Sequence, residues 1–101
     1  MYQELTQLII QVAADMNAAQ GRKIPVERGA DTPLYGREGV LDSLGLASFV
    51  VAVEETIEDN LNISVVLADE KAMSQQSSPF RTIGTLAQYA ARLVGETAPD
   101  A

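Results

Sequence analysis

The sequence predicts an all-α protein of one domain, built from three main helices and some shorter helical pieces around a single core. Three stretches repeat apolar residues every three or four positions, as one face of a helix requires. A long stretch rich in glycine and proline separates the first two. The chain has 101 residues, 47% of them hydrophobic, which suits one modest core.

The first helix is expected over about residues 3–19. Gly21 lies just beyond the periodic stretch, and Arg22 and Lys23 stand at the same end, as is typical of a helix C-terminus. The apolar stripe of this helix consists of Leu5, Leu8, Ile9, Val12, Ala13 and Met16.

A long loop is expected over residues 21–42, which hold four of the seven glycines and two of the four prolines and show no sustained period. Connections longer than about 12–15 residues without structure of their own are uncommon in compact domains and are often functional. The apolar residues that we expect to attach this loop to the core are Leu34, Tyr35, Val40 and Leu41.

The second helix is expected to begin at Asp42 or Ser43 and to run to about Asn60. Its core face consists of Leu46, Phe49, Val50, Val53 and Ile57. The last helix is expected to follow Thr82, a candidate N-cap. Its apolar face consists of Ile83, Leu86, Ala90, Leu93 and Val94.

The stretch between these two helices is more ambiguous. We interpret residues 63–67 as extended packing, because a lone strand has no partner in this sequence. Residues 68–73 are expected to form a turn or two of helix, residues 74–79 a loop, and residues 96–101 a flexible tail.

Composition excludes several classes of function. Seven Lys and Arg against 14 Asp and Glu give a net charge of -7, which argues against a nucleic-acid partner. The chain has no Cys and no His, so disulfides, thiolate nucleophiles, imidazole bases and zinc sites built on those ligands are excluded. No stretch approaches the roughly 18 apolar residues of a membrane span, and Glu4 stands where a signal peptide carries bases. We therefore expect a soluble, cytoplasmic chain without membrane insertion.

The most informative segment is residues 40–46, which places Ser43 in the first turn of a helix directly after the long loop. The first N–H groups of a helix lack intrahelical partners and the macrodipole is positive there, so a phosphate group is favoured. A phosphodiester on Ser43 would lie where the backbone favours negative charge. The alternative interpretation is that Asp42 is only an N-cap and Ser43 only a favourable first-turn residue.

A second face of the same helix lies opposite its core face, taking 100° per residue. It consists of Leu44, Ser48, Val51 and Glu55, with Glu58 at its edge. A partner that reaches Ser43 would bury Leu44 and Val51. The alternative is that these two are ordinary exposed apolar residues, which are normal on protein surfaces.

Acids gather at the far end of this helix, at positions 54, 55, 58 and 59, where the helix dipole disfavours negative charge. The default interpretation is a solvated acidic face. The alternative is that bases on a partner complement these acids and steer association.

The order of these features resembles the acyl carrier protein family. Asp42-Ser43-Leu44 opens a helix that continues to Ile57 and ends in acids, after a helix and a long loop. Phe80-Arg81-Thr82-Ile83 looks like the family's entry into its last helix. The resemblance covers about residues 3–95.

The resemblance implies a four-helix bundle with a short third helix over residues 1–95, and 4′-phosphopantetheine attached to Ser43 through a phosphodiester. The thiol of this cofactor carries acyl groups as thioesters, and Asp42 is the acid beside the attachment serine. The implied partner-binding residues are Leu44, Ser48, Val51, Glu54, Glu55 and Glu58.

The partners that the resemblance implies are a phosphopantetheinyl transferase, an acyl-loading ligase, and acyl-processing or acyltransferase enzymes of fatty acid, lipid or related biosynthesis. The chain itself is expected to be a monomer and not an enzyme, with no catalytic residue and no metal site. Gly45 and Ser48 stand where acids are common in the family, which favours a specialised, stand-alone carrier.

Two alternatives stay open at this point. One is an aminoacyl or peptidyl carrier of a non-ribosomal pathway, which uses the same prosthetic group. The other belongs to a different class: a small helical adaptor in which Ser43 is only a helix cap and the exposed apolar residues bind another helix.

Overall fold

The computed structural model describes residues 2–21, 24–35, 39–67 and 80–97. In these ranges the chain forms α1 (Tyr2–Gln20), the 3-10 helix η1 (Val26–Asp31), α2 (Ser43–Leu61) and α4 (Ile83–Thr97), with no strand among them. The all-α class is therefore confirmed for the described chain. The short helix expected over residues 68–73 and the loop expected over 74–79 lie outside the described residues, so the four-helix bundle stays a prediction.

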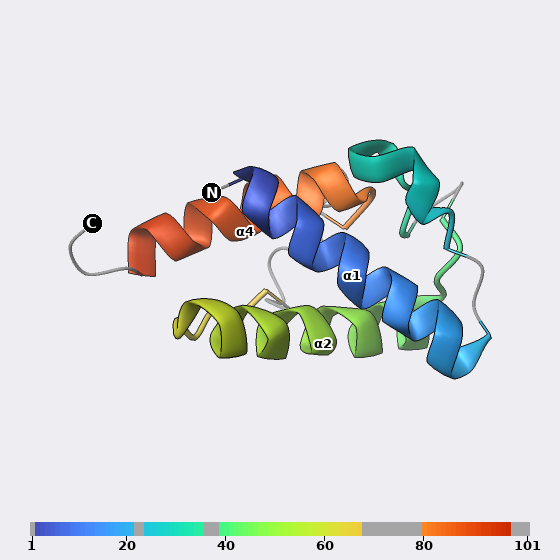
Figure 1. Ribbon diagram of the computed structural model, residues 1–101, viewed down its shortest axis with the longest axis horizontal. Helices are drawn as coiled ribbons and strands as arrows, with labels where there is room; N and C mark the ends of the chain where they lie inside the picture. The colour runs from blue at the N-terminus through green and yellow to red at the C-terminus, as the bar shows by residue number, and fades with distance from the viewer. Residues whose placement is uncertain (1, 22–23, 36–38, 68–79, 98–101) are drawn as a thin grey trace.

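Helix α1 lies between the other two α-helices and packs against both. Figure 1 shows α1 crossing the molecule diagonally, with α2 and α4 on either side and both running in the opposite direction. The short helix η1 packs against α1 and α4. One continuous core fills the space between these elements, and its largest fully buried side chains are Leu5, Ile9, Leu34, Leu46, Phe49, Ile57, Leu67, Phe80, Ile83 and Leu86.

The helix boundaries agree with the apolar periodicity to within one or two residues. Thr82 caps α4 as expected: the Thr85 N–H donates to Thr82 Oγ1 (3.1 Å), and the Thr82 N–H donates to Thr85 Oγ1 (3.0 Å). This reciprocal pair satisfies two backbone donors, in the manner of a capping box. Helix α4 continues to Thr97, two residues into the expected tail.

The connection between α1 and α2 contains η1, which the sequence did not predict. Its two short helical pieces meet at Gly29, whose φ of 63° and ψ of -129° lie outside helical values. Pieces this short carry no apolar period that a sequence pattern can reveal. Of the four residues expected to attach this connection to the core, Leu34 and Leu41 are buried, whereas Tyr35 and Val40 are 37% and 39% exposed.

The start of this connection is held by a side chain of α1. The Asn17 side-chain amide donates to the Ile24 carbonyl (3.0 Å) and accepts from the Ile24 N–H (2.9 Å). Because Ile24 is itself buried, this pair of bonds satisfies backbone groups that have lost contact with water.

The middle of the connection pairs with the beginning of α4. The Leu34 N–H donates to the Arg81 carbonyl (2.8 Å) and the Ile83 N–H donates to the Thr32 carbonyl (3.0 Å), which forms an isolated antiparallel bridge. Thr32 is fully buried, and its hydroxyl lies within hydrogen-bond distance of the Gly29 carbonyl (2.7 Å). The long connection is therefore fastened to the start of α4 by main-chain bonds.

The chain leaves α2 through Asn62, whose left-handed conformation (φ 57°) and N–H bond to the Glu58 carbonyl (2.9 Å) close the helix. Residues 62–67 then run without helix or strand, with Val65 and Leu67 buried and Val66 68% exposed. As expected, residues 63–67 form no strand, and two of them, Val65 and Leu67, pack into the core.

Two glycines of α4 allow a test of how closely η1 packs against α4. A Cβ atom at Gly84 would lie 2.8 Å from the Ala30 carbonyl oxygen, whereas nothing lies within 4 Å of a Cβ atom at Gly95. We expect Gly84→Ala to destabilise the protein by roughly 1–3 kcal/mol through overpacking. Gly95→Ala should stabilise it by roughly 0.5–1 kcal/mol, because alanine is the better helix former. Urea denaturation measures both, and equal effects would contradict the close packing of η1 on α4.

Candidate functional site

The beginning of α2 has the form that the sequence predicted. Asp42 is the N-cap: its backbone is extended, and its Oδ1 accepts a hydrogen bond from the Gly45 N–H (2.7 Å). Ser43 is the first residue of the helix. Leu41 before the cap and Leu46 after it are both buried, the arrangement known as a hydrophobic staple, which fixes the angle at which the chain enters the helix.

The chain segment that precedes Ser43 is also held in place by main-chain hydrogen bonds. The Leu41 N–H donates to the Leu34 carbonyl (2.9 Å), and the Leu34 N–H donates to the Arg81 carbonyl (2.8 Å). Leu34 therefore joins the residue before the cap to the segment that begins α4. These bonds set the position of the first turn of α2 relative to α4.

The electrostatics of this turn favour an anion. The first N–H groups of an α-helix have no intrahelical acceptor, and the dipole of a 19-residue helix places partial positive charge at this end. The first turn of α2 holds no acid, and residues 43–53 carry no charge at all. The Asp42 carboxylate, which directly precedes the helix, accepts a hydrogen bond from the Gly45 N–H.

The face of α2 that the sequence assigned to partners lies in solvent. Leu44 is 80% exposed, Val51 is 47% exposed, and Ser48 and Glu55 are exposed as well. Ala47, which we did not include, is also exposed. Its spacing of three residues from Leu44 was the signal available in the sequence. The stretch next to Ser43 thus presents an uncharged, partly apolar surface.

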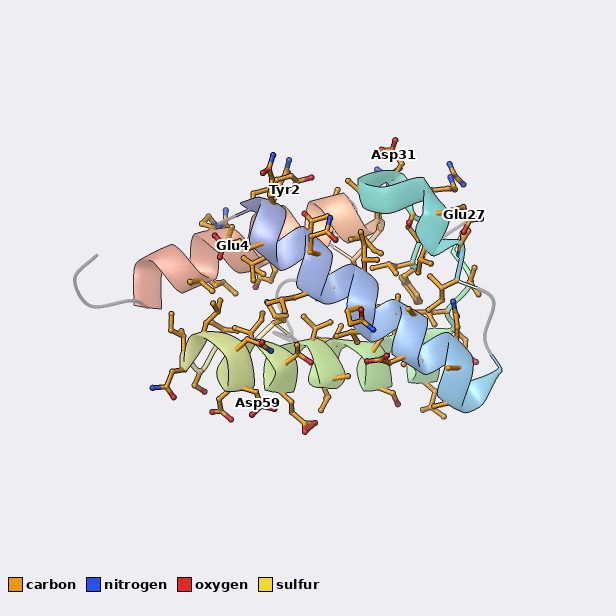
Figure 2. The ribbon with its side chains drawn as sticks, in the orientation of Figure 1. Tyr2, Glu4, Glu27, Asp31 and Asp59 are labelled. Carbon is orange, nitrogen blue, oxygen red and sulfur yellow. The ribbon has the colours of Figure 1, made fainter. Side chains whose placement is uncertain are left out.

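The acids at the other end of α2 do not all share one environment. Glu55, Glu58 and Asp59 are exposed, and Figure 2 shows Asp59 on the side of α2 that faces away from α1. Glu54, by contrast, is half-buried, and its Oε2 accepts a hydrogen bond from the N–H of Leu67. Sequence spacing did not reveal this bond, because its partner lies 13 residues away in an extended segment. In the structure Glu54 therefore holds residues 62–67 against α2.

The described residues include no group of three or more acids that could hold a metal ion. No helix in these ranges combines the length and the apolar character that crossing a bilayer requires. Comparisons with protein-family models, with curated proteins and with solved structures returned no match to this chain.

The cap of α2 can be tested by removing its acceptor. We expect Asp42→Ala to lower the free energy of unfolding by about 1 kcal/mol, because the Gly45 N–H loses its partner. Asp42→Asn should stay within a few tenths of a kcal/mol of the parent chain, since asparagine caps helices equally well. Urea denaturation followed by circular dichroism measures both variants. An alanine variant as stable as the parent would contradict a capping role for this carboxylate.

Proposed function

We propose that this protein is an acyl carrier: it tethers acyl intermediates as thioesters on a 4′-phosphopantetheine group attached to Ser43 and delivers them to partner enzymes. The observation that carries the proposal is the place of Ser43, the first residue of a long capped helix with exposed neighbours on both sides, Asp42 and Leu44. The resemblance of this segment to the attachment site of acyl carrier proteins supports the same conclusion.

The residues at the beginning of α2 fit such a group. The phosphodiester would carry one negative charge, which the first turn of a helix favours. Asp42 is the nearest acid, and its carboxylate is engaged with the Gly45 N–H. The bound group supplies a thiol, which this chain lacks because it has no cysteine.

Attachment of the group is a phosphoryl transfer from coenzyme A. The serine oxygen forms a bond to phosphorus, the pyrophosphate bond breaks, and adenosine 3′,5′-bisphosphate leaves. The serine proton passes to a base of the transferase. The carrier contributes position and docking surface, and the transferase contributes the catalysis.

The exposed face of α2 suits the docking of such enzymes. Leu44 and Val51 offer apolar contact beside Ser43, and the exposed acids Glu55 and Glu58 offer charge to a basic partner. Glu54 contributes through its bond to Leu67, which holds residues 62–67 beside this face. The carrier acts as a cytoplasmic monomer with no catalytic residue of its own, and its uncharged first turns favour a specialised pathway.

The proposal is tested by the intact mass of the protein after incubation with coenzyme A and a promiscuous phosphopantetheinyl transferase. We expect a gain equal to one phosphopantetheine group, and no gain in Ser43→Ala. A parent chain that stays unmodified, under conditions that fully modify a control carrier, would overturn the proposal and favour the helical adaptor. An adenylating enzyme that loads an amino acid onto the thiol would instead favour an aminoacyl carrier.

The docking face is tested by Val51→Asp and Glu55→Lys. Each variant should reduce kcat/KM for loading by roughly fivefold or more, the equivalent of about 1 kcal/mol of lost docking energy. Circular dichroism should stay unchanged, because both side chains are exposed. The matched control is Glu27→Lys, which makes the same charge change on η1, well away from the acidic end of α2 in Figure 2. Normal loading of both α2 variants would reject this face.

A further inference from the structure

One glycine beside the candidate site is required for reasons of space. A Cβ atom built on Gly39 would lie 2.5 Å from the Leu34 carbonyl oxygen and 2.5 Å from the Tyr35 nitrogen, and it would also overlap the Tyr35 Cα atom. Non-bonded carbon atoms prefer separations of about 3.5–4.0 Å. All three neighbours are main-chain atoms, so no side chain can swing aside to make room. The φ of Gly39 is not among the positive values, so the requirement concerns contact and not backbone conformation.

The atom that Gly39 approaches has a structural role of its own. The Leu34 carbonyl oxygen accepts the hydrogen bond from the Leu41 N–H (2.9 Å). Leu34 cannot retreat easily, since it is fully buried and its own N–H is bound to the Arg81 carbonyl. A side chain at position 39 would therefore displace the chain on the other side of the contact, which is the stretch from Gly39 to Leu41.

That stretch leads directly into the cap and the first residue of α2. We infer that Gly39 is a positioning residue for loading. Because it has no side chain, the Leu41 N–H can hydrogen-bond to the Leu34 carbonyl. This hydrogen bond sets the position that Asp42 and Ser43 take in the active site of the transferase. The inference rests on the proposed function of Ser43. It predicts that a methyl group at position 39 misaligns the serine while the docking face farther along α2 stays intact.

The test compares the loading kinetics of the full chain and of Gly39→Ala, with coenzyme A and one phosphopantetheinyl transferase. We expect kcat to fall by roughly tenfold or more, because small misplacements of a reacting group are costly. KM for the carrier should change by less than about twofold, because Val51, Glu55 and Glu58, farther along α2, keep their places. A rise in KM alone, or an unchanged kcat, would overturn the inference.

The matched control is Gly21→Ala. Gly21 has a φ of 67°, and nothing lies within 4 Å of a Cβ atom built there. Alanine at this position strains the backbone at the start of the same connection and should lower stability without changing kcat. A loss of kcat in Gly21→Ala equal to that in Gly39→Ala would assign the effect to general destabilisation and overturn the inference.

Amide hydrogen exchange gives a second readout that does not depend on loading, and its first measurement uses the parent chain alone. In the parent chain the Leu41 N–H should exchange roughly a hundredfold or more slowly than an unstructured amide. In Gly39→Ala it should exchange faster relative to the amides of α1. An unprotected Leu41 amide in the parent chain would overturn the inference.

These outcomes are distinguishable from failure of the proposed function. A parent chain that the transferase does not load at Ser43 overturns both proposals. A parent chain that is loaded, together with a Gly39→Ala variant loaded at the same kcat, overturns only the role of Gly39.

Discussion

The arrangement of this protein depends on the main-chain pairing between residues 32–34 and residues 81–83. The pairing joins two segments about 50 positions apart in the sequence. It thereby orders the long connection between α1 and α2, whose length makes it costly to order. Leu34 is central to it, because its N–H reaches Arg81 and its carbonyl reaches Leu41. The beginning of α2 therefore takes its position from the beginning of α4. Leu34 is fully buried at this pairing, and the hydroxyl of the buried Thr32 beside it donates to the Gly29 carbonyl.

The helices and the cap of α2 could be predicted because their signals are local. Apolar spacing defined the core faces, and Asp42 and Thr82 marked the helix N-termini. The bonds of Leu34, the contact of Glu54 with Leu67 and the close approach at Gly39 could not be predicted in the same way. Each joins main-chain or side-chain atoms of segments whose relative position only tertiary packing determines. A glycine in a long loop usually indicates flexibility, whereas the contacts of Gly39 show a tightly packed position.

Of the acids near the end of α2, Glu54 has a clear structural role. Its hydrogen bond to the N–H of the buried Leu67 satisfies a backbone donor in a segment that forms no helix or strand. The exposed acids Glu55, Glu58 and Asp59 have no such explanation, and no base stands in the last turn of the helix. Glu58 and Asp59, which lie in the last turn, each cost roughly 0.3–1 kcal/mol through the helix dipole before screening by salt. The case for a basic partner therefore rests on these three residues and not on all four.

The separation of charge along α2 is consistent with a phosphodiester at its beginning. At 1.5 Å per residue, Glu55 stands about 18 Å along the helix from Ser43, and Glu58 about 22 Å. Both distances exceed the Debye length of about 8 Å at physiological salt, so these acids repel an anion at Ser43 very little. They would still attract a basic partner of the kind proposed, provided that it covers the helix over the same length. Acids in the first turn would attract a basic partner equally well, but they would place negative charge next to the phosphate proposed for Ser43. The uncharged run from Ser43 to Val53 thus allows one helix to hold an anion at one end and to recruit a basic protein at the other.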